Sequence, residues 1–414
     1  MPWRYDDLLL DLDRRSERRM HFGLERMHAA CARLQHPELA VPTLHIAGTN
    51  GKGSTAAFLA ALLRDAGYRV GVYTSPHLCD YAERFTLDGV PAAHAALAAC
   101  AETTVQLTAD LSLTYFEFST LLAFRYFAAT RPDVVIVETG LGGRLDATNV
   151  VDPVLVLLSP IAIDHAEYLG RDVAAIAAEK CGIMKAGRPV ISAVQLPEVS
   201  AVVEESARAL GCPLQWAEPI AASVPLGLAG AHQRINAGLA WAAAQALRDL
   251  GWRRGRVASL AEAHWPGRCE WWSRHPAVLF DGAHNPAGVA ALVAYLRRIA
   301  DGRDVGVCFG ALADKPVTEM LDLLAPLATR WIAVTPPSAR ALAAADVAAQ
   351  LRRCQAFVTE SALAAVPQLV AAAPDLLWVL TGSLTLYAPL RAAFGTGNFA
   401  GTSEGGAPLR GTLG

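Results

Sequence analysis

The 414-residue sequence lacks an excess of charge of either sign, because 36 Lys and Arg residues oppose 39 Asp and Glu residues. Proteins that bind nucleic acid or acidic membrane surfaces usually carry a basic excess, so we expect neither partner. No run approaches the roughly 18 apolar residues of a membrane-spanning helix. The first residues are charged where a signal peptide needs an apolar stretch, which predicts a cytoplasmic protein.

Closely spaced cysteine pairs are also missing, although the chain contains eight cysteines. No two of them form a C-x-x-C metal site or redox pair, and a chain of this size does not need disulfides for stability. We therefore expect all eight to be reduced. The composition is 53% hydrophobic and only 18% charged, which excludes a disordered chain and supplies a large core. The length predicts two or three domains.

Short apolar runs alternate with longer Ala- and Leu-rich segments along the whole chain. The strands expected in the first part are Thr43–Ala47, Arg69–Tyr73, Asp133–Glu138, Val154–Leu158 and Pro189–Ala193. The strands expected in the second part are Ala277–Asp281, Val305–Phe309, Trp331–Thr335, Ala356–Val358 and Leu377–Thr381, the last followed by a helix over Leu384–Ala393. Apolar strands that alternate with helices predict mostly parallel sheets covered on both faces.

A Gly-rich loop follows the first predicted strand and opens a helix. This candidate phosphate loop consists of Gly48, Thr49, Asn50, Gly51, Lys52, Gly53, Ser54 and Thr55. Its glycines let backbone N–H groups approach phosphates, Lys52 supplies charge, and Ser54 or Thr55 offers a hydroxyl near Mg²⁺. The spacing departs from the usual G-x-x-x-x-G-K-[ST] form, because Gly53 follows the lysine. A Gly-rich turn with a solvated lysine is the alternative.

Three more polar residues lie near predicted strand ends or on a following helix. Glu138 ends a buried strand, at the sheet edge where α/β proteins bind ligands, and its carboxylate suits Mg²⁺; helix capping is the alternative. His165 follows another strand, but imidazole is an unusual Mg²⁺ ligand, so a turn histidine is an equal interpretation. Lys180, next to Glu179, is typical of a solvated ion pair.

Together these motifs resemble the folylpolyglutamate synthase and dihydrofolate synthase family of the wider Mur ligase group. The most specific matches are HIAGTNGKGS at 45–54, ETGLGGRLDATN at 138–149, DHAEYLG at 164–170, EKCGIMK at 179–185 and DGAHNP at 281–286. With the strand pattern, the resemblance predicts an α/β fold with a large N-terminal P-loop-type domain of mostly parallel sheet (1–265). A smaller C-terminal Rossmann-like α/β domain for glutamate ligation (266–396) and a flexible tail (397–414) are expected to follow.

The resemblance also implies roles for matching residues. It implies metal ligation by Ser75, Glu138, His165 and Lys180, the lysine after carbamylation to a carboxylate-like group. It implies catalysis by Lys52, Lys180 and His284, and ATP binding by the phosphate loop, Asn236, Arg268 and Asp281. It implies substrate binding by Arg84, Asp314 and Lys315. Taken alone, Asn236 also fits a helix N-terminus, and the motifs of the second domain also fit turns or caps.

The implied reaction is ATP-dependent amide formation through an acyl phosphate that the amine of L-glutamate then attacks. The implied cofactors are two Mg²⁺ ions, with ATP as co-substrate. The other implied substrates are dihydropteroate and reduced folates. The resemblance also implies a monomer whose two domains close over the site. Segment 76–84 resembles bifunctional bacterial members, which both make dihydrofolate and lengthen its glutamate tail.

Three alternatives remain open at this point. The first is an enzyme that only lengthens the tail. The second is another Mur-type amino-acid ligase that acts on a UDP-linked precursor. The position of the phosphate loop argues against it, because the loop starts at residue 48 and leaves little room before it for a separate UDP-binding domain. The third is a P-loop NTPase module, which gives no reason for the Asp281 and His284 motif.

Overall fold

The computed structural model describes residues 2–16, 23–353 and 356–396, and the predicted tail at 397–414 lies outside them. The described chain forms two compact units. One contains Met1–Cys269 and Asn285–Tyr295, and the other contains Glu270–His284 and the chain from Leu296 on. Each unit has a mostly parallel sheet, which confirms the predicted α/β class. In the three described stretches, no helix has both the length and the apolar character needed to cross a membrane.

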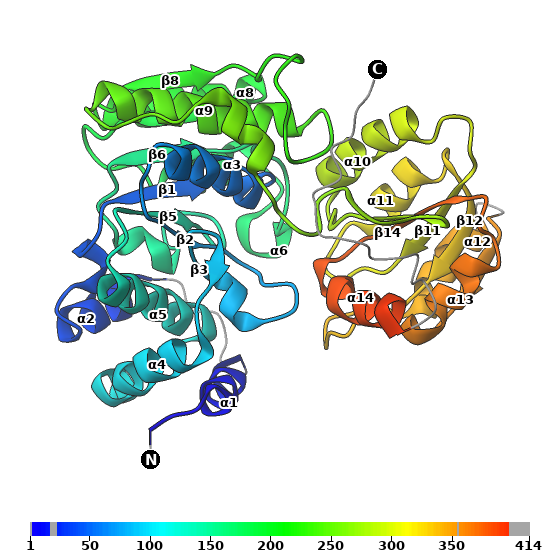
Figure 1. Ribbon diagram of the computed structural model, residues 1–414, viewed down its shortest axis with the longest axis horizontal. Helices are drawn as coiled ribbons and strands as arrows, with labels where there is room; N and C mark the ends of the chain where they lie inside the picture. Colours follow the sequence, from blue (N-terminus) through cyan, green and yellow to red (C-terminus); the bar gives the residue numbers. More distant parts are fainter. Residues whose placement is uncertain (1, 17–22, 354–355, 397–414) are drawn as a thin grey trace. The chain divides into compact units, whose positions relative to one another are not determined.

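The first unit contains an eight-stranded sheet with the order β4-β3-β2-β5-β1-β6-β7-β8 (Figure 1). Its strands are β1 (Thr43–Ala47), β2 (Val70–Tyr73), β3 (Phe85–Leu87), β4 (Val90–Pro91), β5 (Val134–Glu138), β6 (Leu155–Leu158), β7 (Val190–Ala193) and β8 (Leu214–Ala217). Strand β3 pairs antiparallel with both β2 and β4, and the other pairs are parallel. Parallel neighbours require crossover connections, so long helices separate most of these strands in sequence.

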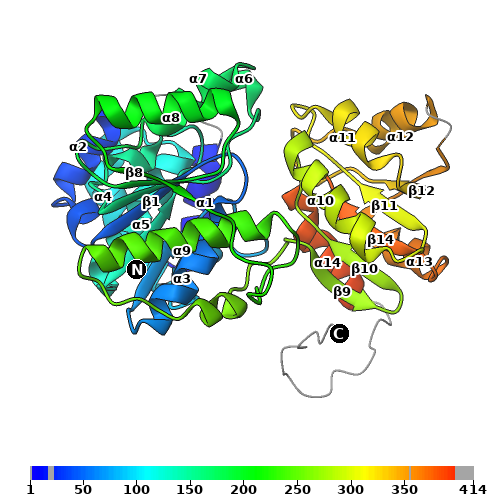
Figure 2. The same ribbon diagram turned by 90° about the horizontal axis from the view of Figure 1, so that it is seen from above.

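Helices cover both faces of this sheet. They are α1 (Tyr5–Ser16), α2 (Glu25–Arg33), α3 (Lys52–Asp65), α4 (His94–Thr108), α5 (Tyr115–Thr130), α6 (Ala166–Leu169), α7 (Val173–Cys181), α8 (Pro197–Ala209) and α9 (Gln233–Asp249). Helices α3 and α9 lie side by side on one face, and α7 packs against α8 on the other (Figure 2). This arrangement explains why the strands are apolar along their whole length.

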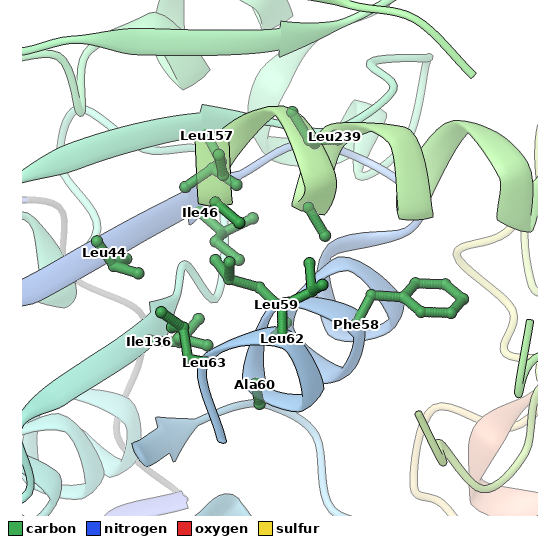
Figure 3. Packing of buried hydrophobic residues seen from close by; sticks show 14 of the residues in the cluster. Leu44, Ile46, Phe58, Leu59, Ala60, Leu62, Leu63, Ile136, Leu157 and Leu239 are labelled. Carbon is green, nitrogen blue, oxygen red and sulfur yellow. The ribbon is translucent and has the colours of Figure 1, made fainter. Parts of the chain in front are cut away.

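Side chains of β1 alternate between these two layers. Leu44 and Ile46 pack with Leu59 of α3 and Leu239 of α9 (Figure 3). Because successive side chains of a strand point to opposite faces, His45 points to the other side of the sheet. It is fully buried there. The central strand therefore contributes to the core on one face and carries a polar group on the other.

The second unit contains a six-stranded sheet with the order β13-β12-β11-β14-β10-β9. Its strands are β9 (Glu270–Arg274), β10 (Ala277–Phe280), β11 (Val305–Phe309), β12 (Ala328–Ala333), β13 (Val358–Glu360) and β14 (Leu377–Thr381). Only β9 pairs antiparallel, with β10. The helices that follow in the chain are α10 (Pro286–Ile299), α11 (Val317–Leu324), α12 (Ala344–Arg353), α13 (Val366–Ala371) and α14 (Tyr387–Thr396).

Some elements of this unit occupy other residues than the sequence predicts. Strand β13 occupies Val358–Glu360 instead of Ala356–Val358, and β12 begins earlier than predicted, at Ala328. The residues of β13 are half-buried or exposed, because it is an edge strand, so it lacks a continuous apolar run. The helix predicted from Leu384 starts as a short 3₁₀ turn, and α14 begins only at Tyr387.

Candidate functional site

The candidate phosphate loop joins β1 to α3, at the carboxyl edge of the sheet where β1 lies between β5 and β6. Gly48 and Gly51 have φ angles of 151° and 86°, which side chains rarely adopt. A Cβ atom on Gly51 would lie 2.2 Å from Oδ1 of Asn236. The N–H groups of Thr49 and Asn50 donate to a carbonyl just beyond β6. The loop is thus fixed by its own backbone and lies directly against α9.

The two hydroxyl side chains at the end of the loop, Ser54 and Thr55, are both buried. Ser54 is almost fully buried, and its Oγ accepts a hydrogen bond of 3.3 Å from Nε2 of Gln233. Thr55 Oγ1 is buried without a hydrogen-bond partner among the described residues. A Cβ atom on Gly53 would lie 2.8 Å from the indole of Trp265, so this ring packs closely on the first turn of α3.

Substituting Gly51→Ala is expected to raise the KM for ATP and to lower stability by more than backbone strain alone. The new methyl group meets Asn236, and positive φ itself costs about 1–2 kcal/mol. The matched control is Gly211→Ala, where φ is 62° and nothing lies within 4 Å of the added Cβ. The control is expected to lose about 1 kcal/mol and to keep its KM for ATP. Equal thermal shifts and KM values in the two variants would contradict the close approach.

Two lysine side chains converge on the carbonyl of Gly48. Lys52 Nζ donates to it at 3.3 Å and to the Thr49 carbonyl at 3.4 Å, and lies 3.7 Å from Oε1 of Glu138. Lys180 Nζ donates to the same Gly48 carbonyl at 2.9 Å. One backbone oxygen therefore holds two amines that stand far apart in the sequence.

Lys180 is not the solvated residue that its sequence neighbourhood suggests. Its side chain comes from α7 and is 5% exposed, whereas Glu179 pairs with Arg144 at 2.7 Å. Burial, reinforced by the charge of Lys52, lowers the pKa of Lys180 to about 7. A large share of this amine is therefore neutral and nucleophilic near pH 7.

Glu138 ends β5 as a buried carboxylate. Burial raises its pKa, while Lys52, Arg268 and a hydrogen bond from the Ser75 N–H lower it in part. The net direction is upward, so these groups do not fully compensate the carboxylate, and an additional cation at this position would be favourable. Ser75 and Arg268 thus both lie within electrostatic or hydrogen-bonding reach of Glu138.

His165 occupies a turn between β6 and α6. Its φ is 52°, its side chain is 38% exposed, and its Nε2 lies 4.0 Å from Oδ2 of Asp164. Within residues 2–16, 23–353 and 356–396, no three or more His, Cys, Asp or Glu side chains are grouped to hold a metal ion. The set predicted for the metal contains one carboxylate and one imidazole. It therefore depends on the hydroxyl of Ser75 and on conversion of Lys180 to a carbamate, which together make the donors mostly oxygen, as Mg²⁺ prefers.

A pocket of about 300 Å³ adjoins this edge of the sheet. Its walls include Ser75, Arg84, Tyr115, Phe116, Gly140, Leu141 and Asp146. Arg84 is 6% exposed, donates from Nε to His77 Nδ1 at 2.9 Å, and lies 5.3 Å from the ring centroid of Tyr115. The pocket thus combines aromatic walls with the cation of Arg84 and the two acids Glu117 and Asp146, which suits a planar aromatic ligand that carries both hydrogen-bond donors and an acidic group.

Asn236 lies in the first turns of α9 and is buried. Its Nδ2 donates to Oε1 of Gln233 at 2.9 Å, and its Oδ1 faces Gly51. His232 stands at the helix N-cap, so Asn236 does not cap α9. The structure therefore brings Asn236 together with the phosphate loop, as it does Lys52, Lys180, Glu138, Ser75 and Arg268.

The remaining predicted residues belong to the second unit. Asp281 directly follows β10, and its Oδ1 accepts a hydrogen bond of 2.9 Å from the N–H of Ala283. His284 Nδ1 lies 2.8 Å from the carbonyl of Gly282, so this nitrogen carries the hydrogen. The loop after β11 holds Asp314, which pairs with Arg340 at 3.6 Å, and Lys315. All four lie beyond the carboxyl ends of β10 and β11, the edge where α/β sheets bind ligands.

Two buried or half-buried acids of the first unit, Asp146 and Asp164, were not predicted to belong to the site. Asp146 is buried and accepts hydrogen bonds from the N–H groups of Gly140 and Leu141, at 2.9 and 2.8 Å. Asp164 and Asp146 both act on the Lys180 amine by raising its pKa against the larger effect of burial. Both acids lie within motifs that the sequence analysis quoted, so the signal was present, but their common proximity to Lys180 appears only in the fold.

Comparisons with known proteins show which family the chain resembles. A family model described as "Mur ligase, glutamate ligase domain" matches residues 267–384. The dihydrofolate synthase/folylpolyglutamate synthase of Bacillus subtilis is 38% identical over 345 residues, which cover 74% of this chain and 79% of that protein. The structure of Escherichia coli FolC in complex with DHPP and ADP superposes with a TM-score of 0.86 at 30% identity, over 95% of this chain and 98% of that one.

A further solved structure contains a metal ion and a nucleotide analogue. The bifunctional folylpolyglutamate synthase/dihydrofolate synthase of Yersinia pestis, complexed with AMPPNP and a Mn ion, superposes with a TM-score of 0.84 at 29% identity. The match covers 95% of this chain and 98% of that one.

Proposed function

The chain belongs to the dihydrofolate synthase/folylpolyglutamate synthase family of Mur-type ligases, and from this premise we propose how it acts. It is an ATP-dependent ligase that adds L-glutamate to dihydropteroate, forming dihydrofolate, and to reduced folates, forming folylpolyglutamates. The observation that carries this proposal is the convergence of Lys52, Lys180 and Glu138 at the phosphate loop, next to a pocket of about 300 Å³.

The reaction has two chemical steps. A carboxylate oxygen of the folate precursor attacks the γ-phosphorus of ATP, the bond between that phosphorus and the β–γ bridging oxygen breaks, and ADP leaves. The amine of L-glutamate then attacks the carbonyl carbon of the acyl phosphate, loses a proton, and displaces inorganic phosphate. The protein contributes mainly by positioning the reactants and offsetting the charge that develops on the transferred group.

Within the first unit, we propose roles for four side chains at this edge of the sheet. Lys52, held over the loop by two carbonyls, offsets charge on the transferred phosphoryl group. Asn236 contacts the adenine base, and Arg268 contacts phosphate oxygens. Arg84 binds the acidic end of the folate precursor in the pocket that it shares with Ser75.

We propose that two Mg²⁺ ions act with ATP, held by Ser75, Glu138, His165 and carbamylated Lys180. When bound, they would neutralise phosphate charge and align the γ-phosphate for in-line attack. The neutral Lys180 amine can add CO₂ and release a proton, because its pKa is lowered to about 7. The buried, incompletely compensated carboxylate of Glu138 fits a neighbouring cation.

For the second unit, we propose that His284 faces the transferred phosphate and Asp281 contacts the nucleotide. Asp314 and Lys315 receive L-glutamate. In this proposal residues 1–265 form the ATP-binding domain and 266–396 the glutamate ligase domain. The match of residues 267–384 to the glutamate ligase domain supports this division.

The proposed function is tested by ADP release in a substrate-omission series. The purified protein receives ATP, Mg²⁺ and L-glutamate, with dihydropteroate, a reduced folate or UDP-muramyl-alanine added singly. We expect ADP release that requires both glutamate and a pterin, with activity on dihydropteroate as well as on the folate. Activity on the folate alone would restrict the enzyme to tail lengthening. Dependence on the UDP-linked acceptor, or release without any acceptor, would contradict the assignment.

A further inference from the structure

A buried chain of hydrogen bonds starts at His45 in the centre of the first sheet. Nε2 of His45 lies 2.8 Å from Oγ1 of Thr148, and this hydroxyl donates to Oδ1 of Asp146. All three side chains are at most 5% exposed. None of them has a role in the reaction proposed above.

The direction of this chain follows from the chemistry of its members. Asp146 receives four donors, from the N–H groups of Gly140, Leu141 and Thr148 and from the Thr148 hydroxyl, so both of its oxygens act as acceptors. The single hydroxyl proton of Thr148 is therefore committed to Asp146, and its oxygen accepts from His45. We assign the hydrogen of the imidazole to Nε2, and Nδ1 has no hydrogen-bond partner among the described residues.

The imidazole cannot easily take a second proton. Burial and the charge of Lys185 lower the pKa of His45 to about 3, so the ring stays neutral. A neutral ring with one N–H provides one fixed donor, and the donor points at Thr148. The chain therefore keeps the same direction throughout the pH range in which enzymes are assayed.

Asp146, at the far end of this hydrogen-bond chain, holds one wall of the pocket of about 300 Å³. Asp146, Gly140 and Leu141 all line that pocket, and Gly140 and Leu141 are joined to Asp146 through Oδ2. The wall also fits tightly, because a Cβ atom on Gly140 would lie 2.4 Å from the ring of Phe116. A small rotation of the Asp146 carboxylate would therefore move the backbone turn that faces the ligand.

We infer that His45 and Thr148 are positioning residues for the pterin-bearing substrate, because they orient Asp146 and through it the Gly140–Leu141 turn. The inference rests on the proposed function, in which this pocket receives the folate precursor. Neither residue touches the substrate. Their effect is to hold the pocket wall in the one arrangement that fits a planar ring.

Three variants test the inference by steady-state kinetics and thermal unfolding. Thr148→Val removes the hydroxyl but keeps the shape, and it leaves the His45 N–H buried without an acceptor. We expect the KM for dihydropteroate to rise about ten-fold and the unfolding temperature to fall. The KM for ATP is expected to stay within about two-fold, because the phosphate loop is held by its own backbone bonds. Thr148→Ser keeps the hydroxyl and is expected to behave like the wild type.

The double variant His45→Leu/Thr148→Val separates positioning from stability. In this variant both partners of the hydrogen bond, the His45 N–H and the Thr148 hydroxyl, are absent, so no buried donor is left without an acceptor. The unfolding temperature is therefore expected to be higher than that of Thr148→Val. Asp146 still lacks its hydroxyl donor, so the KM for dihydropteroate is expected to stay raised. A KM that follows the unfolding temperature back to the wild-type value would overturn the inference, as would an unchanged KM in Thr148→Val.

The wild type assayed in parallel distinguishes the two proposals. If it releases ADP only with dihydropteroate and glutamate, the proposed function stands whatever the variants do. If the wild type releases no ADP in response to dihydropteroate, the proposed function itself is contradicted, and this result does not depend on the behaviour of the variants.

Discussion

Lys180→Ala is expected to lose about 10³-fold in turnover while keeping its fold. The amine lies 2.9 Å from the Gly48 carbonyl, beside Lys52 and near Asp164 and Asp146. Removing it deletes a buried charge-bearing group from the centre of the proposed metal and phosphate site. The measurement is kcat for ADP release at saturating substrates, together with the unfolding temperature. Turnover close to the wild type would remove Lys180 from the mechanism.

The role of a carbamate at Lys180 has its own readouts. Wild-type protein equilibrated with ¹³C-bicarbonate is expected to show a carbamate resonance that Lys180→Ala lacks. Because only the neutral amine adds CO₂, the signal and the activity are expected to fall together below the pKa of about 7. Acetate or formate, which can place a carboxylate in the space left by the deletion, is expected to restore part of the lost turnover.

Lys185→Ala is the matched control for this experiment. Lys185 lies five positions further along the chain, is only partly buried, and donates to the Asn149 carbonyl at 3.0 Å, away from the Gly48 carbonyl. Its loss is expected to leave kcat within about two-fold and the ¹³C signal unchanged. A similar loss in both variants would mean that any lysine on this segment is needed for the fold.

Lys52→Met is the second large effect, with an expected loss of about 10³-fold in kcat. Methionine keeps much of the length of the side chain and removes its charge, so the transferred phosphoryl group loses a cation that Gly48 and Thr49 hold in place. The change is expected to appear mainly in kcat, because this charge matters most when negative charge develops in the transition state. Single-turnover ADP formation measures it directly.

A second consequence of Lys52→Met links the two lysines. The charge of Lys52 helps to lower the pKa of Lys180, so its removal is expected to raise that pKa above about 7. The ¹³C-carbamate signal of Lys52→Met should then need a higher pH to reach the wild-type level. An unshifted pH profile would show that the two amines do not interact.

The phosphate loop could be predicted from the sequence because its signals are local. A strand, a run of glycines, a lysine and a helix start stand next to one another, and Gly48, Gly51 and Lys52 adopt the expected positions. The strand ends carrying Glu138 and Asp281 were predictable for the same reason. Such signals depend on a few neighbouring residues and do not need the order of strands in the sheet.

The environment of Lys180 could not be predicted in this way. A Glu–Lys pair on a helix is usually solvated, and only the packing of α7 beneath the phosphate loop buries the amine. The contact between His45 and Thr148 joins residues that are 103 positions apart, and it depends on β1 lying next to β5 and β6. The residue range of the edge strand β13 was predicted wrongly, because half-exposed strands have weak apolar patterns.

Neighbouring side chains of β1 point to opposite faces of the sheet, so some of them pack in the core and others contact the residues behind the pocket. Leu44 and Ile46 face α3 and α9, whereas His45 faces the wall of the substrate pocket through Thr148. Changes at Leu44 and Ile46 are therefore expected to act through the core alone, whereas changes at His45 act on the pocket wall as well. A mutational scan of β1 would separate the two kinds of effect: loss of folded protein alone at Leu44 and Ile46, and a raised KM for dihydropteroate as well at His45.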